Sequence, residues 1–294
     1  MTNQAKAYIY AGLTVFFWST VATAFKIALR DLNSIQLLLA ANFTALLVFA
    51  ILLLIQGKMP LVRTMTVRKI GLSALQGMLN PFAYYLLIFK AYSLLPAQVA
   101  QPANFVWPVV LLLLSAPLLK QPLRWTNIAA LLISFTGVLI LSSQGNLSSF
   151  HIVQPLGIGL ALLSSLVWSL LWITNLKDDR DNLVKLFLSS LFSALYILIL
   201  ALITHNASSV LSKPLYAPIY IGLFEMGITF AFWLKALQLS DSTGKVANFI
   251  YLTPFLSLIF IHLILHEKLF YTSFIGLCLI VAGIMVGRIK NEKG

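Results

Sequence analysis

The chain has 294 residues, of which 60% are hydrophobic and 10% charged, and its 20 basic and 8 acidic side chains give a net charge of +12. A soluble globular domain is about 45–50% apolar and about 25% charged, so the composition excludes that class and indicates a membrane protein. The single cysteine, Cys278, excludes an internal disulfide and a cysteine-rich metal site.

Ten apolar segments approach the roughly 20 residues that a helix needs to cross the hydrocarbon core. In chain order they cover approximately residues 8–29, 35–55, 70–89, 97–119, 126–141, 156–175, 183–203, 218–237, 246–265 and 272–287. The connections are short, which leaves no room for a separate soluble domain. We therefore expect an all-α membrane protein with ten transmembrane helices.

Basic residues near the ends of these segments predict the orientation. With the N-terminus in the cytoplasm, 15 of the 20 basic residues lie inside, and the five outside are Lys26, Arg30, Lys90, Lys213 and Lys268. Both termini are then cytoplasmic. The positive charge follows from this topology, so we expect no nucleic-acid partner and a multi-pass location in the cell (inner) membrane.

The two halves of the chain resemble each other in the order of their motifs. The matching residues are Trp18-Ser19 with Trp168-Ser169, Lys90-Ala91 with Lys235-Ala236, and Ala103-Asn104-Phe105 with Ala247-Asn248-Phe249. Each half holds five spans, so the second half enters the membrane in the opposite sense. This predicts two inverted five-helix repeats, residues 1–145 and 146–294, a plan common among secondary transporters.

These motifs make the chain resemble the EamA-type proteins of the drug/metabolite transporter superfamily over nearly its whole length. The resemblance rests on Phe17-Trp18-Ser19-Thr20, Lys90-Ala91, Lys235-Ala236, the prolines of spans four and nine, and His266-Glu267-Lys268-Leu269. The family pattern has an acid after the fourth helix of each repeat; Glu267 fits, whereas Gln121 departs from it. The resemblance implies a proton- or gradient-linked carrier or exchanger of metabolites, often an amino-acid exporter.

Hydroxyl and indole side chains form a stripe on the first span and a matching stripe on the sixth. The first stripe also includes Ala22 and Lys26: it runs Thr14, Trp18, Ala22, Lys26 with Ser19 alongside, and the stripe of the sixth span runs Ser164, Trp168, Trp172 with Ser169 alongside. Residues four apart share a helix face, so these stripes predict the walls of a substrate cavity. Trp18, Ser19, Lys26, Trp168 and Trp172 are the candidate binding residues. The alternatives are helix packing through small residues and, for Lys26, snorkelling to the interface.

Amides supply a second group of candidates. Gln98, Gln101 and Asn104 follow one another at i, i+3 spacing in the fourth span, and Asn248 lies in the ninth. Amides can bind both an ammonium and a carboxylate, so Gln101, Asn104 and Asn248 are candidate substrate-binding residues. Interhelical hydrogen bonding is the alternative interpretation.

Glu225 is the only acid deep inside a predicted span, and the residue at its place in the first repeat is Asn80. An intramembrane carboxylate indicates a functional site by default, as a proton carrier or as the partner of a cation. Glu225 is therefore the candidate for proton coupling, and Glu225, Asn80 and Tyr84 are candidate substrate-binding residues. The alternative is a neutral structural glutamate that hydrogen-bonds to a neighbouring helix.

The sequence contains no Walker loop, Gly-rich nucleotide fingerprint, nucleophile elbow or metal-ligand cluster, so we expect no enzymatic activity, catalytic residue, cofactor or metal. The first span also lacks the glutamate of the small multidrug resistance relatives, which argues against a purely cationic multidrug role.

The expected function is secondary-active export of an amino acid or related metabolite by alternating access. The alternatives are uptake or exchange of a cationic or sugar-like compound, and a non-transporting membrane enzyme or assembly factor. The expected partners are a small-molecule substrate and the lipid bilayer, with proton coupling and a homodimer left open.

Overall fold

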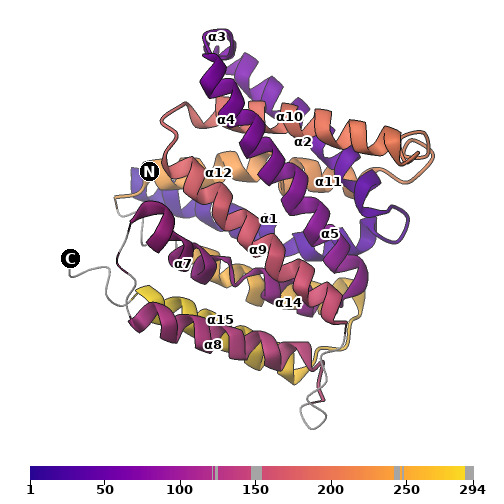
Figure 1. Cartoon of the computed structure of the whole chain (residues 1–294), viewed down its shortest axis with the longest axis vertical. Coiled ribbons are helices and arrows are strands. Elements are labelled where there is room, and N and C mark those ends of the chain that lie inside the picture. The colour runs from indigo at the N-terminus through magenta and orange to yellow at the C-terminus, as the bar shows by residue number, and fades with distance from the viewer. Residues whose placement is uncertain (121, 123–124, 147–153, 242–245, 247, 289–294) are drawn as a thin grey trace. The chain divides into compact units, whose positions relative to one another are not determined.

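The computed structural model describes residues 1–120, 122, 125–146, 154–241, 246 and 248–288, and all the regular structure in this part of the chain is helical (Figure 1). By length and composition, nine helical segments in these residues can cross a membrane, and a shorter apolar helix, Tyr271–Gly287, follows them. The chain is therefore an all-α, multi-pass protein, as predicted. Gln121, which departs from the family pattern, and Arg124, Lys245, Lys290 and Lys293, which contribute to the predicted orientation, lie outside the described residues.

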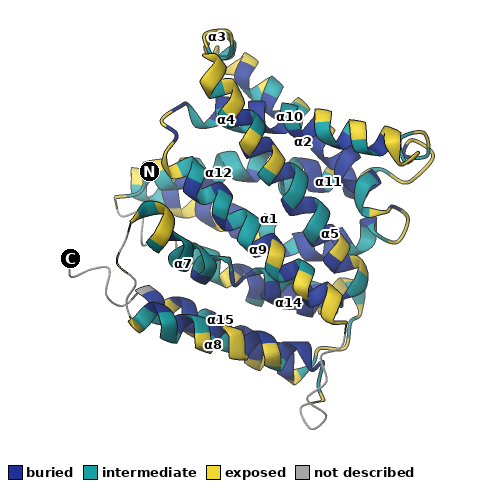
Figure 2. Ribbon diagram, viewed as in Figure 1, coloured by how far each residue is buried: buried dark blue, intermediate teal, exposed yellow. Residues whose placement is uncertain are grey.

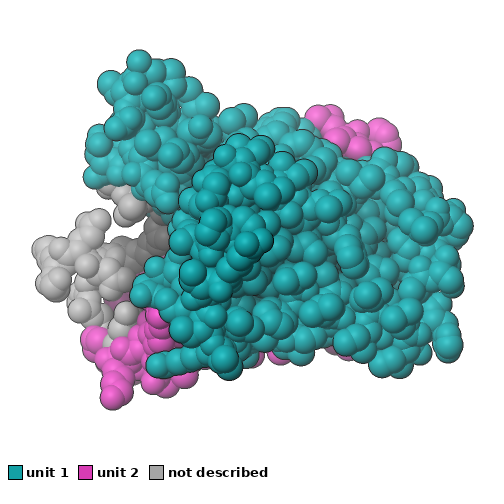
Figure 3. All heavy atoms as spheres, turned by 90° about the horizontal axis from the view of Figure 1, so that it is seen from above, with its two compact units in different colours: residues 1–86, 179–260 teal, residues 87–178, 261–294 magenta. Residues whose placement is uncertain are grey.

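The chain divides into two compact units, and each takes helices from both predicted repeats (Figure 3). Unit 1 consists of Met1–Leu86 and Asp179–Phe260, and unit 2 of Leu87–Asp178 and Ile261–Gly294.

The helices of unit 1 are α1 (Asn3–Ala28), α2 (Ser34–Ile55), α3 (Met59–Arg63), α4 (Val67–Gly77), the π-helical η1 (Met78–Ala83), α10 (Asn182–Ile203), α11 (Tyr216–Phe224), α12 (Ile228–Leu239) and the 3-10 helix η2 (Asn248–Leu252). Helix α1 packs on α11 and α12, α2 on α10 and α11, and α10 also on α4 and η1. Two further helices, α5 (Tyr84–Leu94) and α14 (Thr253–Leu265), begin in unit 1 and end in unit 2.

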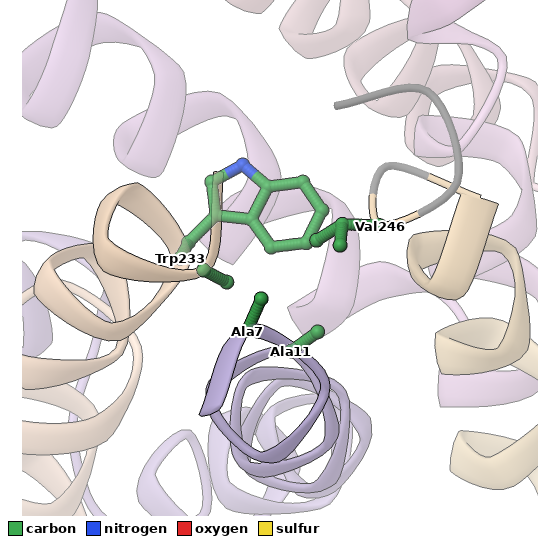
Figure 4. Packing of buried hydrophobic residues seen from close by; sticks show 5 residues of the cluster. Ala7, Ala11, Trp233 and Val246 are labelled. Carbon is green, nitrogen blue, oxygen red and sulfur yellow. The ribbon is translucent and has the colours of Figure 1, made fainter. Parts of the chain in front are cut away.

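Small residues allow the helices of unit 1 to approach closely. A Cβ at Gly77 would lie 2.5 Å from the Ser189 carbonyl oxygen of α10. In α1, Ala7 and Ala11 leave room for the Trp233 indole of α12, which lies over them in a buried cluster (Figure 4). Larger side chains at these positions would separate the helices, since interiors are close-packed.

Unit 1 also presents apolar side chains on its outer surface. In α2, Leu47, Ile51 and Leu54 are each more than half exposed at i, i+4, i+7 spacing. An exposed apolar stripe on one helix face is unfavourable in water but favourable in contact with lipid.

The helices that lie wholly in unit 2 are α6 (Ala97–Asn104), α7 (Trp107–Leu119), α8 (Trp125–Ser142), α9 (Pro155–Leu176) and α15 (Tyr271–Arg288). Helices α6 and α7 pack on α9, and α8 packs along α15. The α8–α15 contact is close because Gly137 and Gly276 face each other: a Cβ on either would lie 2.6 Å from the carbonyl oxygen of the other.

Four of the spans are not continuous helices. Span three runs from Val67 to Leu94, longer than the predicted 70–89, and is interrupted at Asn80, whose φ of −150° and ψ of 128° are extended. Span eight is interrupted between α11 and α12, span four between α6 and α7, and span nine begins with η2. Proline and glycine account for the breaks, because Pro81, Pro108 and Pro254 lack a backbone donor and Gly227 carries no side chain.

Candidate functional site

The helix break in span eight places Glu225 between two half-helices (Figure 1). Helix α11 ends at Phe224 and α12 begins at Ile228, and both Glu225 and Met226 donate their N–H to the Ile221 carbonyl, at 2.8 and 3.0 Å. Gly227 follows with φ −108° and ψ −103°. A Cβ there would lie 2.7 Å from the Gly222 carbonyl oxygen, so the break requires glycine.

Two side chains from other helices of unit 1 hold Glu225. The Tyr85 hydroxyl donates to Glu225 Oε1 at 3.1 Å, and the Trp18 indole N–H donates to the Glu225 backbone carbonyl at 3.5 Å. Tyr85 is only 1% exposed, so its hydroxyl is fixed in place. No Lys, Arg or His in the described part of the chain forms an ion pair with Glu225. The carboxyl group is thus oriented by a neutral donor and forms no ion pair with a residue that the structure describes.

Aromatic side chains of α1 pack against rings that flank Glu225 in the chain or, in Tyr85, bind its carboxyl group. Phe17 stacks on Phe224 with ring centroids 4.4 Å apart, and Trp18 makes an edge contact with Phe230 at 5.4 Å. The Tyr85 ring packs edge-on against Phe25, also from α1. Ring faces attract cations, so this environment complements a positively charged ligand.

Asn80 occupies the corresponding break in span three. Its side chain is 9% exposed, and its Oδ1 has no hydrogen-bond donor among the described residues. Tyr84 is 8% exposed and its ring contacts Tyr85 at 4.8 Å. Three of the candidates, Asn80, Tyr84 and Glu225, therefore lie at or beside two repeat-related breaks of unit 1.

The tryptophan candidates of unit 2 meet in one cluster. Trp107, which the sequence did not single out, stacks on Trp172 at 6.3 Å and an interplanar angle of 14°, and Trp168 contacts both edge-on. The Trp172 Nε1 is buried without an acceptor among the described residues. The cluster can stack a planar group and still has a donor to offer.

The amide stripe of span four divides into two roles. Gln98 uses its whole amide on the 267–270 loop: its Nε2 donates to the Lys268 carbonyl at 3.0 Å and its Oε1 accepts from Phe270 N–H at 2.8 Å. The Gln101 Oε1 is buried with no donor in the described residues, and Asn104 donates to the Ser164 hydroxyl at 2.8 Å. Gln101 is therefore the member of the stripe with binding capacity left.

Three candidates are less well placed for binding. Ser19 is fully buried and donates its hydroxyl to the Phe16 carbonyl of its own helix at 2.7 Å. Lys26 lies half-buried in the last turn of α1, and Asn248 is exposed at the start of η2.

Tyr85 and Gly227 were not found by sequence reasoning. Gly227 stands two residues after Glu225, and a glycine that close to an intramembrane acid is a signal for a break. Tyr85 gives no such signal, because 140 residues separate it from its partner.

Broken spans that carry polar side chains at their breaks, in a multi-pass helical fold, are typical of membrane transporters. The sequence pattern of the EamA-like transporter family matches residues 5–143 and 155–287, one copy in each half. The chain belongs to the EamA-like transporter family.

The individual relatives that the chain resembles are described as transporters. An uncharacterized transporter from Archaeoglobus fulgidus is 24% identical over 99% of this chain and 100% of its own length, and a second from that organism is 21% identical over 96% and 98%. The uncharacterized transporter YvbV from Bacillus subtilis is 25% identical over 73% of this chain and 70% of its own. A solved crystal structure shares the fold, with a TM-score of 0.64 and 19% identity over 98% of both chains.

Proposed function

We propose that the chain is a secondary-active transporter of a small metabolite that carries an ammonium group, such as an amino acid, and that it moves this substrate outward by alternating access. In this proposal ten helices span the cell (inner) membrane as two inverted repeats, residues 1–145 and 146–294, with both termini in the cytoplasm.

The observation that carries the proposal is the Glu225 carboxyl group, oriented by Tyr85 and without a cationic partner among the described residues. A carboxylate inside a membrane is costly unless it is paired or protonated. An ammonium group of the substrate and a proton are the two partners that remove this cost. Glu225 binds the ammonium group when substrate is present and a proton when substrate is absent. Transport of the substrate is thereby coupled to the movement of protons.

The helix breaks support movement around this group. Half-helices joined by a short non-helical segment can change their relative angle without unfolding, and discontinuous helices mark the substrate sites of many secondary transporters. Pro102, Pro108 and Pro254 are the hinge candidates in spans four and nine.

The remaining sequence candidates, among which Ser19, Lys26 and Asn248 are the less well placed, stay candidate substrate-binding residues, each within its own unit. They are Trp18, Ser19, Lys26, Asn80, Tyr84, Gln101, Asn104, Trp168, Trp172 and Asn248.

Flux into sealed vesicles that contain the purified protein tests the proposal. The panel pairs each labelled amino acid with the amine that lacks its carboxylate and the acid that lacks its amine. We expect saturable flux of compounds with an ammonium group, a response to an imposed pH gradient, and loss of both in Glu225→Gln. Flux of the acids alone, or undiminished flux in Glu225→Gln, would contradict the role of Glu225.

A second candidate function is transport of a purely cationic compound, which the aromatic rings near Glu225 favour. The same panel distinguishes it from amino-acid transport. In that case the amines are carried and the amino acids are not. A membrane enzyme or assembly factor gives no saturable flux with any member.

A further inference from the structure

The short connection between α2 and α4 in unit 1 carries basic and apolar side chains that the transport function does not use. Residues 56–66 join two membrane-spanning helices, Ser34–Ile55 and the span that begins at Val67, so this segment lies where chain leaves and re-enters the bilayer. Residues 56–70 include four basic residues and no acid: Lys58, Arg63, Arg68 and Lys69.

These four cations fall into two pairs with different surroundings. Lys58 forms an ion pair with Asp181 at 2.7 Å, and Lys69 lies 3.9 Å from Asp179. Both arginines are exposed, and neither has a hydrogen bond or ion pair with any described residue. The acids of the 179–181 turn therefore pair with the lysines, closely for Lys58 and at the limit of an ion pair for Lys69, and leave the arginines available.

Exposed apolar side chains lie close to the two arginines in the sequence. Leu61 is 42% exposed, Val67 is 87% exposed and Ile70 is 40% exposed, and α3 lies at one end of unit 1 with much of its surface exposed (Figure 2). An arginine guanidinium binds a phosphate group with two parallel hydrogen bonds. Free phosphate would leave the apolar side chains in water, whereas a phospholipid covers them with its glycerol and acyl region.

We infer that Arg63 and Arg68, together with Leu61, Val67 and Ile70, form a binding site for the phosphate headgroup of an anionic phospholipid. A basic segment at the end of a membrane span attracts anionic lipid through each charge near the surface. The guanidinium groups bind the phosphate and the apolar side chains contact the lipid below it. The site fixes α3 at the level of the headgroups.

A photoreactive phosphatidylglycerol probe in phosphatidylcholine vesicles that contain the whole protein tests this site. Covalent labelling is mapped by mass spectrometry. We expect labelling of residues 56–70 that falls about 30-fold in the double variant Arg63→Gln/Arg68→Gln. The matched control, Arg30→Gln/Lys213→Gln, removes the same charge from exposed positions elsewhere in unit 1 and keeps the label. The variant Arg63→Lys/Arg68→Lys keeps part of it, because charge remains but paired hydrogen bonds are lost.

Three outcomes would overturn the inference. One is unchanged labelling in the double glutamine variant, and another is equal labelling of the wild-type protein by a photoreactive phosphatidylcholine. The third is displacement of the probe by inorganic phosphate as effectively as by unlabelled phosphatidylglycerol, since that would identify free phosphate as the ligand. The last two comparisons use the wild-type protein, so they hold even if the double variant does not fold.

Discussion

Spans three and eight are broken at corresponding places of the two repeats, yet they carry different chemistry at the break. Span three has the neutral Asn80, buried and with an unused acceptor, whereas span eight has Glu225, whose carboxyl group accepts from Tyr85. The break itself therefore needs no acid: proline supplies it in one span and glycine in the other. The carboxyl group in span eight is an addition to the shared architecture, which is why we assign it a role in transport.

Neutralising Glu225 removes the chemical difference between the breaks of spans three and eight, and we expect it to have the largest effect. Glu225→Gln makes the two breaks chemically alike while keeping an oxygen for the Tyr85 hydroxyl, so we expect a folded protein whose flux falls about hundredfold, the effect of removing one partner of a desolvated charged pair. Vesicle flux is the measurement. Asp31→Asn, at an exposed acid between spans one and two, is the control and should transport normally.

Adding a methyl group at the span-eight break tests its geometry. In Gly227→Ala the new Cβ meets the backbone oxygens of Gly222 and Leu223 at 2.7 and 3.0 Å, and we expect a loss of about 1–3 kcal/mol in the free energy of unfolding. The melting temperature in detergent measures it. Gly159→Ala is the matched control, because nothing lies within 4 Å of a Cβ there; an equal drop in both variants would contradict the steric argument.

Removing only the hydroxyl that holds the carboxyl group sharpens the comparison. Tyr85→Phe keeps the ring against Phe25 but deletes the donor to Glu225, and we expect about a tenfold loss of apparent substrate affinity. Concentration-dependent flux gives the KM. A KM unchanged from wild type would show that Tyr85 does not orient Glu225 for binding.

The smallest expected effect is that of replacing Asp181, an acid outside the membrane that forms an ion pair with Lys58. Burial raises the pKa of Asp181, but hydrogen bonds from Lys58 and from the Val184 and Leu183 N–H groups, with the Lys58 charge, hold it below its ordinary 3.8. Because the folded-state pKa is the lower one, the stabilisation is present above the unfolded-state pKa and is lost as pH falls through the folded value, below about pH 4. Asp181→Asn should lower the melting temperature by a small amount at neutral pH, and the difference should vanish in acid. A difference that persists at low pH would assign the effect to the N-cap geometry instead.

The sequence predicted the helical, membrane-spanning class, the family, the two repeats and the position of Glu225 within its span, because these depend on composition, order and local spacing. Contacts between residues far apart in the chain could not be predicted from the sequence. Gln98 and Gln101 share one spacing pattern, but only the structure shows that the first amide is used by the 267–270 loop. Tyr85 and Trp107 lacked a local signal, since each acquires its partners from distant helices.

The close contact of Gly137 and Gly276 makes α8 and α15 a suitable pair of helices for a reference distance within the protein. Because the two backbones are in contact at these glycines, we expect the pair to move as a single body. Cys278 on α15 is exposed and is the chain's only thiol, so one added cysteine at the exposed Thr136 of α8 creates a defined pair for spin labels. The distance between the labels should stay constant throughout a transport cycle, which provides the fixed reference against which motions elsewhere in the protein can be calibrated.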